Sequence, residues 1–525
     1  MSQDEGGSAE TVPSAVGHTR PVGDAAGRSE RGRIAVGGLW NASAWFVSTG
    51  IGAALTIVLV RVMVPAQYGD FAIALAGTSL LSAVAGLGLN LAVAQVASAE
   101  RVEQGDTGLR ATLDVSFRIA LISAGATTLV AVVLALVASD LVPSVRPERA
   151  AFLAMVPIIT VTPLAAVYSG FLRVTFKPRV IVASAVGSSV LQAALVAGAI
   201  LAGLKSAAEI AGTRTVANLA ATAVLAVAVH RWRVGAPAAA ATRTLWRRVL
   251  GFSGAMLLTG VFTTMVSQLD VFILGVDRGN RPTALYQPLS RLTDLLLGLP
   301  VLLGNYFLPA VSAAAARSDD AEVRRLYHWA SRWNLVVCAP ALGVVLVCAA
   351  PVLRILFGRS YGTVAGSLQV LALGAIVQVV FGFNGLALDG YGLARLVAIR
   401  QTIALVVSAV ACVTLIPVLG ILGAAAATSV AMAVSNLMCS GVLLVRFRVR
   451  PWDRALAITA AGFALAIGAS FALEDALRSD WWRSVVTVVV VGTVTLASSL
   501  AAGGKRERRA ILRQYSKLAG RGLQS

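Results

Sequence analysis

Apolar segments of membrane-crossing length recur along almost the whole chain. Fourteen such runs can be marked in 525 residues, each of about 20 residues or more, the length that crosses the hydrocarbon core of a bilayer as a helix. Hydrophobic residues make up 57% of the chain and charged residues only 13%, too few to cover a soluble protein of this length. We therefore expect an all-α polytopic membrane protein with about 14 transmembrane helices. The expected spans are 34–60, 70–97, 115–138, 150–172, 180–203, 207–229, 249–276, 283–314, 333–353, 362–388, 396–417, 421–445, 455–473 and 484–502.

The positive charges predict the orientation of these spans. If the N-terminus lies in the cytoplasm, Lys and Arg favour the inner segments over the outer loops by about three to one, as the positive-inside rule requires. Both termini are then cytoplasmic, and the protein lies in the cytoplasmic membrane. The net charge of +19 is explained by these basic inner segments, so no nucleic-acid partner is expected. The first residues are polar without an apolar core, which indicates a disordered tail and not a signal peptide.

Two segments of the chain resemble one another weakly. The segment from Val64 (VPAQYGDF) and the segment from Arg281 (RPTALYQPL) each run from Pro and Tyr through an apolar stretch to Gly and Asn. Six spans separate the two starts, which predicts two six-helix lobes around a central cavity, a repeat typical of secondary transporters. The expected divisions are a disordered cytoplasmic tail (1–33), an N-terminal six-helix lobe (34–229), a basic cytoplasmic linker (230–248), a C-terminal six-helix lobe (249–446), two additional transmembrane helices (447–502) and a basic cytoplasmic tail (503–525).

Four ionisable side chains fall deep within apolar runs: Arg214, Asp270, Arg291 and Asp294. Such groups are unfavourable in lipid and normally face a protein interior or a watery cavity. Arg291 and Asp294 share one helix face, and Gly298 and Pro300 follow where a membrane helix can bend. One interpretation is a cationic cavity, because the planar guanidinium fork of arginine suits phosphate oxygens. The other is a pair of structural ion pairs, since two arginines balance two aspartates. Both remain open at this stage.

Asn90 is a further candidate for the cavity. It falls in the inner half of its span, where interhelical hydrogen bonding explains it at least as well as sugar contact.

Several motifs together resemble one known family. Arg61-Val-Met-Val-Pro-Ala-Gln-Tyr-Gly69, followed by Gly86-Leu-Gly-Leu-Asn90, is similar to the opening signature of the polysaccharide-biosynthesis, O-antigen-type oligosaccharide flippases. These belong to the multidrug/oligosaccharidyl-lipid/polysaccharide (MOP) exporter superfamily. Leu356-Phe-Gly358 and Leu415-Ile-Pro417 fit the same pattern, so the resemblance covers roughly 34–450.

The resemblance implies a function and a set of partners. It implies a flippase that moves polyprenyl-pyrophosphate-linked oligosaccharide repeat units from the cytoplasmic to the outer leaflet, for capsule, exopolysaccharide or O-antigen-like polymer. The implied partners are that lipid-linked oligosaccharide, the lipid bilayer, and the glycosyltransferases and polymerase of polysaccharide assembly.

Other functions remain as alternatives. A multidrug exporter, or an exporter of another lipid-linked cell-wall precursor, would belong to the same superfamily. A membrane glycosyltransferase or polymerase would need a sizeable outer domain, whereas the outer loops here are short. No GxxxxGK[ST], HExxH, CxxC or nucleophile-elbow pattern occurs, and the four cysteines lack metal-ligand spacing. We therefore expect no enzymatic activity, no cofactor and no metal site.

Overall fold

The computed structural model describes residues 44–141, 146–175, 178–235, 242–298, 300–473 and 480–503. Within these ranges the chain is helical and contains no β-strand, and twelve helices are long and apolar enough to cross a membrane. The prediction of an all-α, multi-pass membrane protein is confirmed. The predicted N-terminal tail (1–33), residues 236–241 of the predicted linker and residues 504–525 of the predicted C-terminal tail lie outside the described residues.

The expected count of about 14 spans and the twelve membrane-length helices of the described residues differ for two reasons. The helical stretch Pro65–Val137 contains two of the expected spans, separated by the non-helical Gly105 at φ 65°. The expected span 283–314 is divided near Pro300 into two helices, neither of which is both long and apolar enough alone. The number of membrane-length helices is therefore lower by two, because one helical stretch contains two expected spans and one expected span is divided between two shorter helices.

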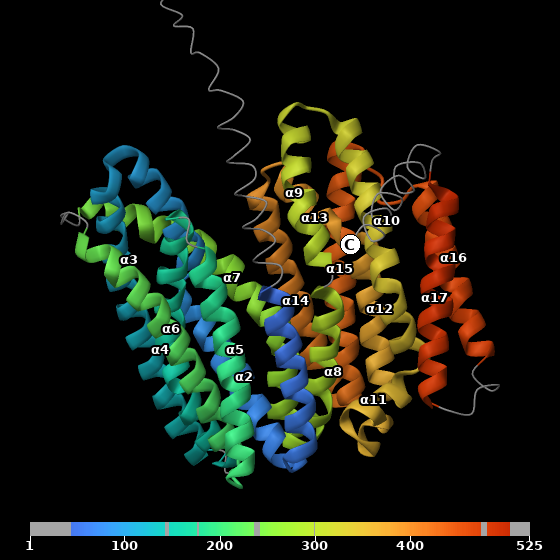
Figure 1. Cartoon of the computed structure of the whole chain (residues 1–525), viewed down its shortest axis with the longest axis horizontal. Helices are drawn as coiled ribbons and strands as arrows, with labels where there is room; N and C mark the ends of the chain where they lie inside the picture. Colours follow the sequence, from blue (N-terminus) through green and yellow to red (C-terminus); the bar gives the residue numbers. More distant parts are fainter. Residues whose placement is uncertain are drawn as a thin grey trace, which may run out of the picture.

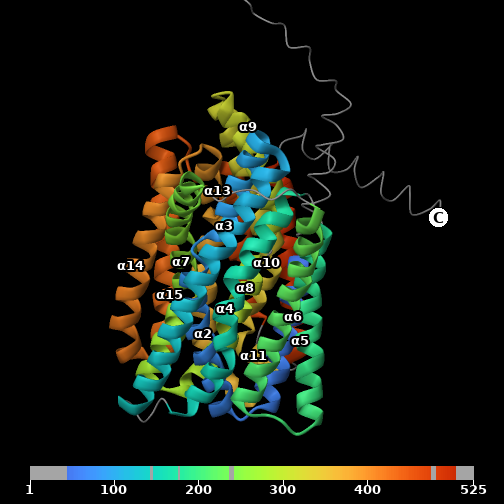
Figure 2. The ribbon, with the colours of Figure 1, turned by 90° about the vertical axis from the view of Figure 1, so that its left-hand side faces the viewer.

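The first lobe contains the helices from the N-terminal part of the chain, and Figure 2 shows this lobe facing the viewer. Its helices are Ala44–Val62, α2 (Pro65–Gly86), α3 (Leu89–Leu141), α4 (Arg146–Val174), α5 (Pro178–Leu201) and α6 (Ala207–Gly235). α4 lies at the centre of this lobe, packed against α2, α3 and α6. Because α6 ends at Gly235, it extends into the first residues of the predicted linker (230–248).

The second lobe follows, and in Figure 1 it lies beside the first. Its helices are α7 (Arg243–Arg278), α8 (Asn280–Gly298), α9 (Pro300–Ala316), α10 (Asp320–Val347), α11 (Ala349–Phe357), α12 (Ala365–Phe381), α13 (Phe383–Gly390), α14 (Ala394–Leu419) and α15 (Ile421–Phe447), with a short 3₁₀ turn at Arg359–Val364. α7 connects the lobes, because it contacts α2 and α3 of the first lobe and α14 and α15 of the second.

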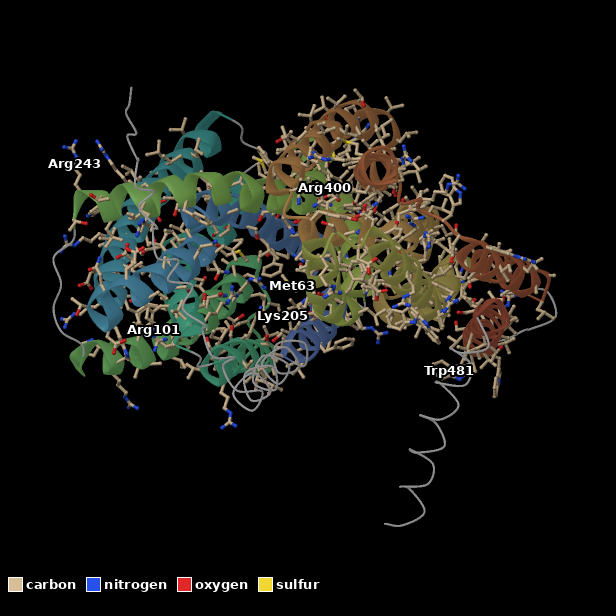
Figure 3. The ribbon with its side chains drawn as sticks, turned by 90° about the horizontal axis from the view of Figure 1, so that it is seen from above. Met63, Arg101, Lys205, Arg243, Arg400 and Trp481 are labelled. Atoms are coloured by element: carbon tan, nitrogen blue, oxygen red, sulfur yellow. The ribbon has the colours of Figure 1, made fainter. Side chains whose placement is uncertain are left out.

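The last two helices, α16 (Arg454–Ala472) and α17 (Asp480–Ala502), pack on the second lobe away from the first. They contact each other and α10, and a Cβ at Gly343 of α10 would lie only 2.8 Å from Val491 of α17. Figure 3 shows them, with Trp481, at the edge of the molecule farthest from the first lobe.

The hydrophobic cores show where the lobes join. One buried cluster includes residues of both lobes, such as Tyr68 of α2, Leu289 of α8 and Leu371 of α12. At the other end each lobe has its own cluster, around Phe171 in the first lobe and around Tyr327 in the second. The lobes therefore share a core at one end, here called the joined end. They have separate cores at the opposite end, here called the split end.

Both members of the internal repeat contain a broken helix. α2 ends at Gly86, and the chain passes through Leu87 at φ 46° and Gly88 at φ 63° before α3 begins. α8 ends at Gly298, and α9 begins at Pro300. Positive φ is adopted most easily by glycine, and proline lacks the N–H that a continuous helix needs. The two sequences thus use different residues to interrupt helices at related places in the repeat.

Candidate substrate-binding cavity

A polar cavity of about 340 Å³ lies between the lobes. It is lined by the helix Ala44–Val62, α2, α5 and α6 from the first lobe and by α8 from the second. Its polar side chains are Ser48, Thr49, Thr56, Tyr68, Ser188, Ser189, Gln192, Arg214, Asn218, Gln287, Arg291 and Asp294. A second cavity of about 280 Å³ shares Leu75, Arg214 and Asn218 with the first, so Arg214 and Asn218 lie where the two adjoin.

Three of the four deep charges predicted from the sequence line this cavity. Nη1 of Arg291 donates to Oδ2 of Asp294 at 3.3 Å, and the two side chains are 34% and 46% exposed. No carboxylate in the described ranges lies within 4 Å of the Arg214 guanidinium, whose like charge interacts with that of Arg291. The fixed charge of the lining is therefore positive, with one paired and one unpaired arginine.

Helical spacing explains how these groups reach the cavity. Gln287, Arg291 and Asp294 are four and three residues apart on α8, so they form one stripe along the helix. Arg214 and Asn218 are one turn apart on α6, and Nδ2 of Asn218 donates to the Arg214 carbonyl at 2.9 Å. That bond fixes the amide beside the guanidinium. Each lobe thus contributes an arginine together with an amide.

Several buried polar atoms around the cavities have no hydrogen-bond partner among the described residues. In the first cavity these are Oγ of Ser48 and Oε1 of Gln287, and in the second Oγ1 of Thr78 and Oγ of Ser82. A buried polar atom without a partner lowers stability by about 1–3 kcal/mol. These atoms are therefore available to water or to a polar ligand such as a sugar.

Asp270 lies elsewhere, in the core of the second lobe. Its Oδ2 accepts hydrogen bonds from the Tyr286 hydroxyl at 2.6 Å and from Oγ1 of Thr428 at 2.7 Å. These partners belong to α8 and α15, and the Asp270 side chain is buried. Asp270 is absent from the lining of the cavity, and it does not pair with Arg291 or Arg214. It joins three helices of one lobe.

Asn90 is also outside the cavity lining. The hydroxyl of Ser169 on α4 lies 3.5 Å from Oδ1 of Asn90. A Cβ at Gly170 would be 2.8 Å from the Asn90 carbonyl oxygen, so α4 approaches the start of α3 closely here. Asn90 therefore lies at a contact between two helices of the first lobe.

The signature between Arg61 and Asp70 lies at the joined end and contacts the second lobe. Arg61 donates from Nε to the Leu356 carbonyl at 2.8 Å and from Nη2 to the Ile355 carbonyl, at the end of α11. Nδ2 of Asn280 donates to Oδ1 of the buried Asp70. These contacts hold the lobes together at this end.

Gly69 permits the closest of these approaches. A Cβ at this position would lie 2.1 Å from the Asn280 carbonyl oxygen, a distance that no real side chain tolerates. The glycine of the signature is therefore required by contact between the lobes.

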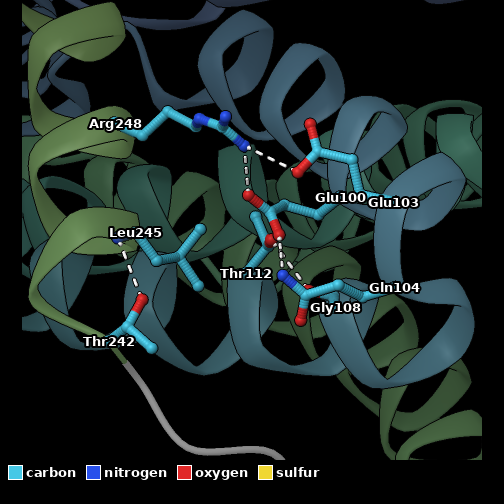
Figure 4. Close-up of polar contacts among 8 residues, drawn as sticks. All are labelled: Glu100, Glu103, Gln104, Gly108, Thr112, Thr242, Leu245 and Arg248. Atoms are coloured by element: carbon cyan, nitrogen blue, oxygen red, sulfur yellow. Dashed lines mark hydrogen bonds and ion pairs between the residues drawn. The ribbon is translucent and has the colours of Figure 1, made fainter.

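At the split end, the start of α7 is attached to the first lobe (Figure 4). Nη1 of Arg248 lies 2.5 Å from Oε1 of the buried Glu100 and 3.3 Å from Oε2 of Glu103. The hydrogen bond with Glu100, followed by that with Glu103, raises the pKa of the Arg248 guanidinium. Leu245 and Val249 are buried against α3 and its neighbours. This part of the predicted linker is thus a helix that packs on protein.

Sequence reasoning missed most of the uncharged lining. Ser188, Ser189 and Gln192 lie within one turn of α5, and Asn218 follows Arg214 by four residues. A polar stripe at helical spacing within an apolar span would have indicated them. Single polar residues in membrane helices are common, so only the stripe is informative.

The fold and the cavity define a two-lobed helical membrane protein with a polar cavity between its lobes. A sequence profile described as "Polysaccharide biosynthesis protein" matches residues 58–366, and the chain belongs to this family. The chain is 23% identical over 192 residues to the "Probable low-salt glycan biosynthesis flippase Agl15" of Haloferax volcanii, a match that covers 37% of this chain and 41% of that protein.

Solved structures share the fold. A structure of "Lipid II flippase MurJ, inward closed conformation" superimposes with a TM-score of 0.70 at 14% identity, over 88% of this chain and 98% of that one. An inward-facing multidrug resistance MATE family transporter of the MOP superfamily gives a TM-score of 0.58 at 14% identity, over 79% and 94% of the two chains. At this identity the likeness concerns the fold alone.

Proposed function

We propose that this protein is a flippase that moves polyprenyl-pyrophosphate-linked oligosaccharide repeat units across the cytoplasmic membrane for cell-surface polysaccharide synthesis. The observation that supports it most is the pair of arginines, Arg214 and Arg291, which face one cavity from opposite lobes among hydroxyl and amide groups. The family of the chain agrees with this proposal.

The cavity offers a group for each polar part of such a substrate. Guanidinium groups bind phosphate oxygens through two parallel hydrogen bonds, and a pyrophosphate offers oxygens to both arginines at once. Oε1 of Gln287 and Oγ of Ser48 are available to accept hydrogen bonds from sugar hydroxyls. The polyprenyl chain is apolar and remains in the lipid. The reaction is translocation, so no covalent bond forms or breaks.

Movement of the lobes would carry the substrate across. Transport by alternating access requires that the lobes open at one end while they close at the other. In the present arrangement the contacts of Arg61 and of Asp70 close the joined end. Under the predicted orientation, the joined end faces outward and the split end faces the cytoplasm, where the lipid-linked substrate is made. Glycosyltransferases would then supply the substrate on one side, and a polymerase would consume it on the other.

A multidrug exporter is the second candidate. Asp294 supports it, because this carboxylate is 46% exposed in the cavity and would attract a cationic drug. The two arginines oppose it, since they give the lining a positive balance. The same balance would also suit another lipid-linked cell-wall precursor that carries a pyrophosphate.

Charge substitutions at Arg291 test the proposal. Arg291→Lys should retain partial translocation of lipid-linked oligosaccharide, while Arg291→Ala and Arg291→Glu should lose it with protein still in the membrane. Arg291→Leu combined with Asp294→Leu should also be inactive. Full activity of this double variant, normalised to protein level, would reject a role for Arg291 in phosphate binding. Export of a cationic dye that is lost with Asp294→Asn would favour the multidrug exporter.

A further inference from the structure

A second basic cavity, distant from the one between the lobes, lies at the split end of the second lobe. It measures about 570 Å³ and is formed by the start of α10, the end of α15 and the segment that leads into α16. We call it the basic groove, and its polar and aromatic residues are Arg324, His328, Arg448, Arg450, Trp452 and Asp453.

The charges of the groove are strongly unbalanced. Three arginines line it, from α10 and from the residues after α15, and Asp453 is its one carboxylate. Asp453 already caps α16, because its Oδ1 accepts from the Leu456 amide at 2.7 Å. No carboxylate in the described part of the chain lies within 4 Å of the guanidinium groups of Arg324, Arg448 or Arg450. The groove therefore offers three exposed cations without an anion to pair with them.

The groove is held in shape by its own contacts. Nε2 of His328 hydrogen-bonds to the Arg450 carbonyl at 2.8 Å, which ties the segment after α15 to α10. Arg448 ends α15 in the left-handed conformation, at φ 53°, a position that favours glycine or asparagine. The sequence thus keeps a long cationic side chain where the backbone favours a small residue. Below the groove, Tyr327 and Val449 are fully buried.

The depth of the groove corresponds to the membrane–water interface. The apolar span of α15 ends at Phe447, and the next one begins at Arg454, so the groove lies between two span ends. Trp452 is 59% exposed there, and exposed tryptophans gather at the level of the lipid headgroups. A ligand in this place would sit among headgroups and not in bulk water.

We propose that the basic groove binds the phosphate of an anionic phospholipid headgroup, with the acyl chains lying along the apolar surface next to Trp452. Unpaired arginines at this depth suit a phosphodiester through charge-assisted hydrogen bonds. Under the predicted orientation the lipid belongs to the cytoplasmic leaflet. A free phosphate or pyrophosphate shares the headgroup chemistry but lacks the acyl chains. The inference is independent of what the central cavity transports.

Native mass spectrometry of the purified full-length protein in detergent tests this site. Phosphatidylglycerol is titrated against phosphatidylcholine of the same acyl chains, with and without excess inorganic phosphate. The test variant is Arg448→Gln with Arg450→Gln. The matched control, Arg446→Gln with Arg359→Gln, removes the same charge at exposed positions outside the groove. An arginine that faces the bound headgroup in the groove should contribute about fivefold to the affinity for anionic lipid, the scale known for basic residues at a membrane surface, whereas an arginine outside the groove does not face that headgroup.

The proposal predicts that wild type prefers phosphatidylglycerol. The Kd should rise on the order of 25-fold in the test variant and less than about threefold in the control. Arg448→Lys with Arg450→Lys should retain most of the affinity. Equal weakening in the control, no preference between the lipids, or displacement by inorganic phosphate would each overturn the assignment. If the test variant unfolds at a lower temperature than wild type in the absence of lipid, Arg324→Gln is used as the test variant instead. Arg324 lies on the opposite wall of the groove.

Discussion

Arg291 and Asp294 form an ion pair one turn apart on α8, with 3.3 Å between Nη1 and Oδ2, and both side chains remain accessible from the cavity. An ion pair in contact with water contributes only about 0.2–1 kcal/mol to stability, because solvent screens the charges. A fully buried pair would behave differently, since removal of one partner leaves an uncompensated charge. The exposure of this pair therefore argues that it is dispensable for folding.

The first prediction compares the two aspartates of the second lobe. Asp294→Asn should change the free energy of unfolding by less than about 1 kcal/mol, because the pair that it breaks is exposed. Asp270→Leu should lower it by about 2–3 kcal/mol, because the hydroxyls of Tyr286 and Thr428 lose their acceptor. Denaturant unfolding in detergent measures both. Equal effects would show that the different surroundings of the two carboxylates have no energetic consequence.

The second prediction concerns contact between the lobes. Gly69→Ala places a methyl group against the Asn280 carbonyl and should force the lobes apart at the joined end. A single cysteine at Gln287, in a background without the four native cysteines, should then react faster with an impermeant thiol reagent added from that side. Gly50→Ala is the control, since a Cβ there meets nothing within 4 Å. Unchanged labelling in Gly69→Ala would contradict the claim that this contact keeps the joined end closed.

The third prediction concerns orientation in the membrane. The charge distribution places Arg243 in the cytoplasm and Lys205 outside, and both side chains are exposed. In the same cysteine-free background, Lys205→Cys should react with an impermeant reagent in intact cells, whereas Arg243→Cys should react only after lysis. The reverse pattern would invert the orientation and, with it, the predicted direction of transport.

Sequence reasoning could predict the fold because membrane helices are largely determined by local composition. Each apolar run must satisfy its backbone hydrogen bonds within itself, so length and hydrophobicity identify the helix without tertiary information. Breaks were harder to place. Pro300 indicated one break. The expected spans that end at residue 97 and begin at residue 115 lie instead on one long helix from Leu89, which is interrupted only at a single glycine, Gly105.

The site could be predicted only in part, because a deep charge does not reveal what it faces. Arg214, Arg291 and Asp294 line the cavity, whereas Asp270, equally deep in its run, is bound by Tyr286 and Thr428. The partners of Asp270 are 16 and 158 residues away in sequence. Hydropathy carries no information on such tertiary contacts. The neutral lining was missed for the related reason that one Ser or Gln in an apolar span is not distinctive.

The central claim is that Arg214 and Arg291 bind the pyrophosphate of a lipid-linked oligosaccharide. Arg214 is the sharper test of the two, because no carboxylate in the described ranges pairs with it, so its removal leaves no aspartate without its partner. Asn218→Ala, one turn away and also in the lining, is a matched control that leaves the charge unchanged.

The most direct measurement is translocation in proteoliposomes of two substrates that differ by one phosphate, a polyprenyl-pyrophosphate-linked and a polyprenyl-monophosphate-linked oligosaccharide. Wild type should prefer the pyrophosphate. Arg214→Gln should slow pyrophosphate translocation about 10-fold to 100-fold, as loss of a charge-assisted hydrogen bond worth about 1.5–3 kcal/mol implies. It should affect the monophosphate much less, whereas Asn218→Ala should affect both alike. Equal loss on the two substrates in Arg214→Gln, or no loss at all, would contradict the account.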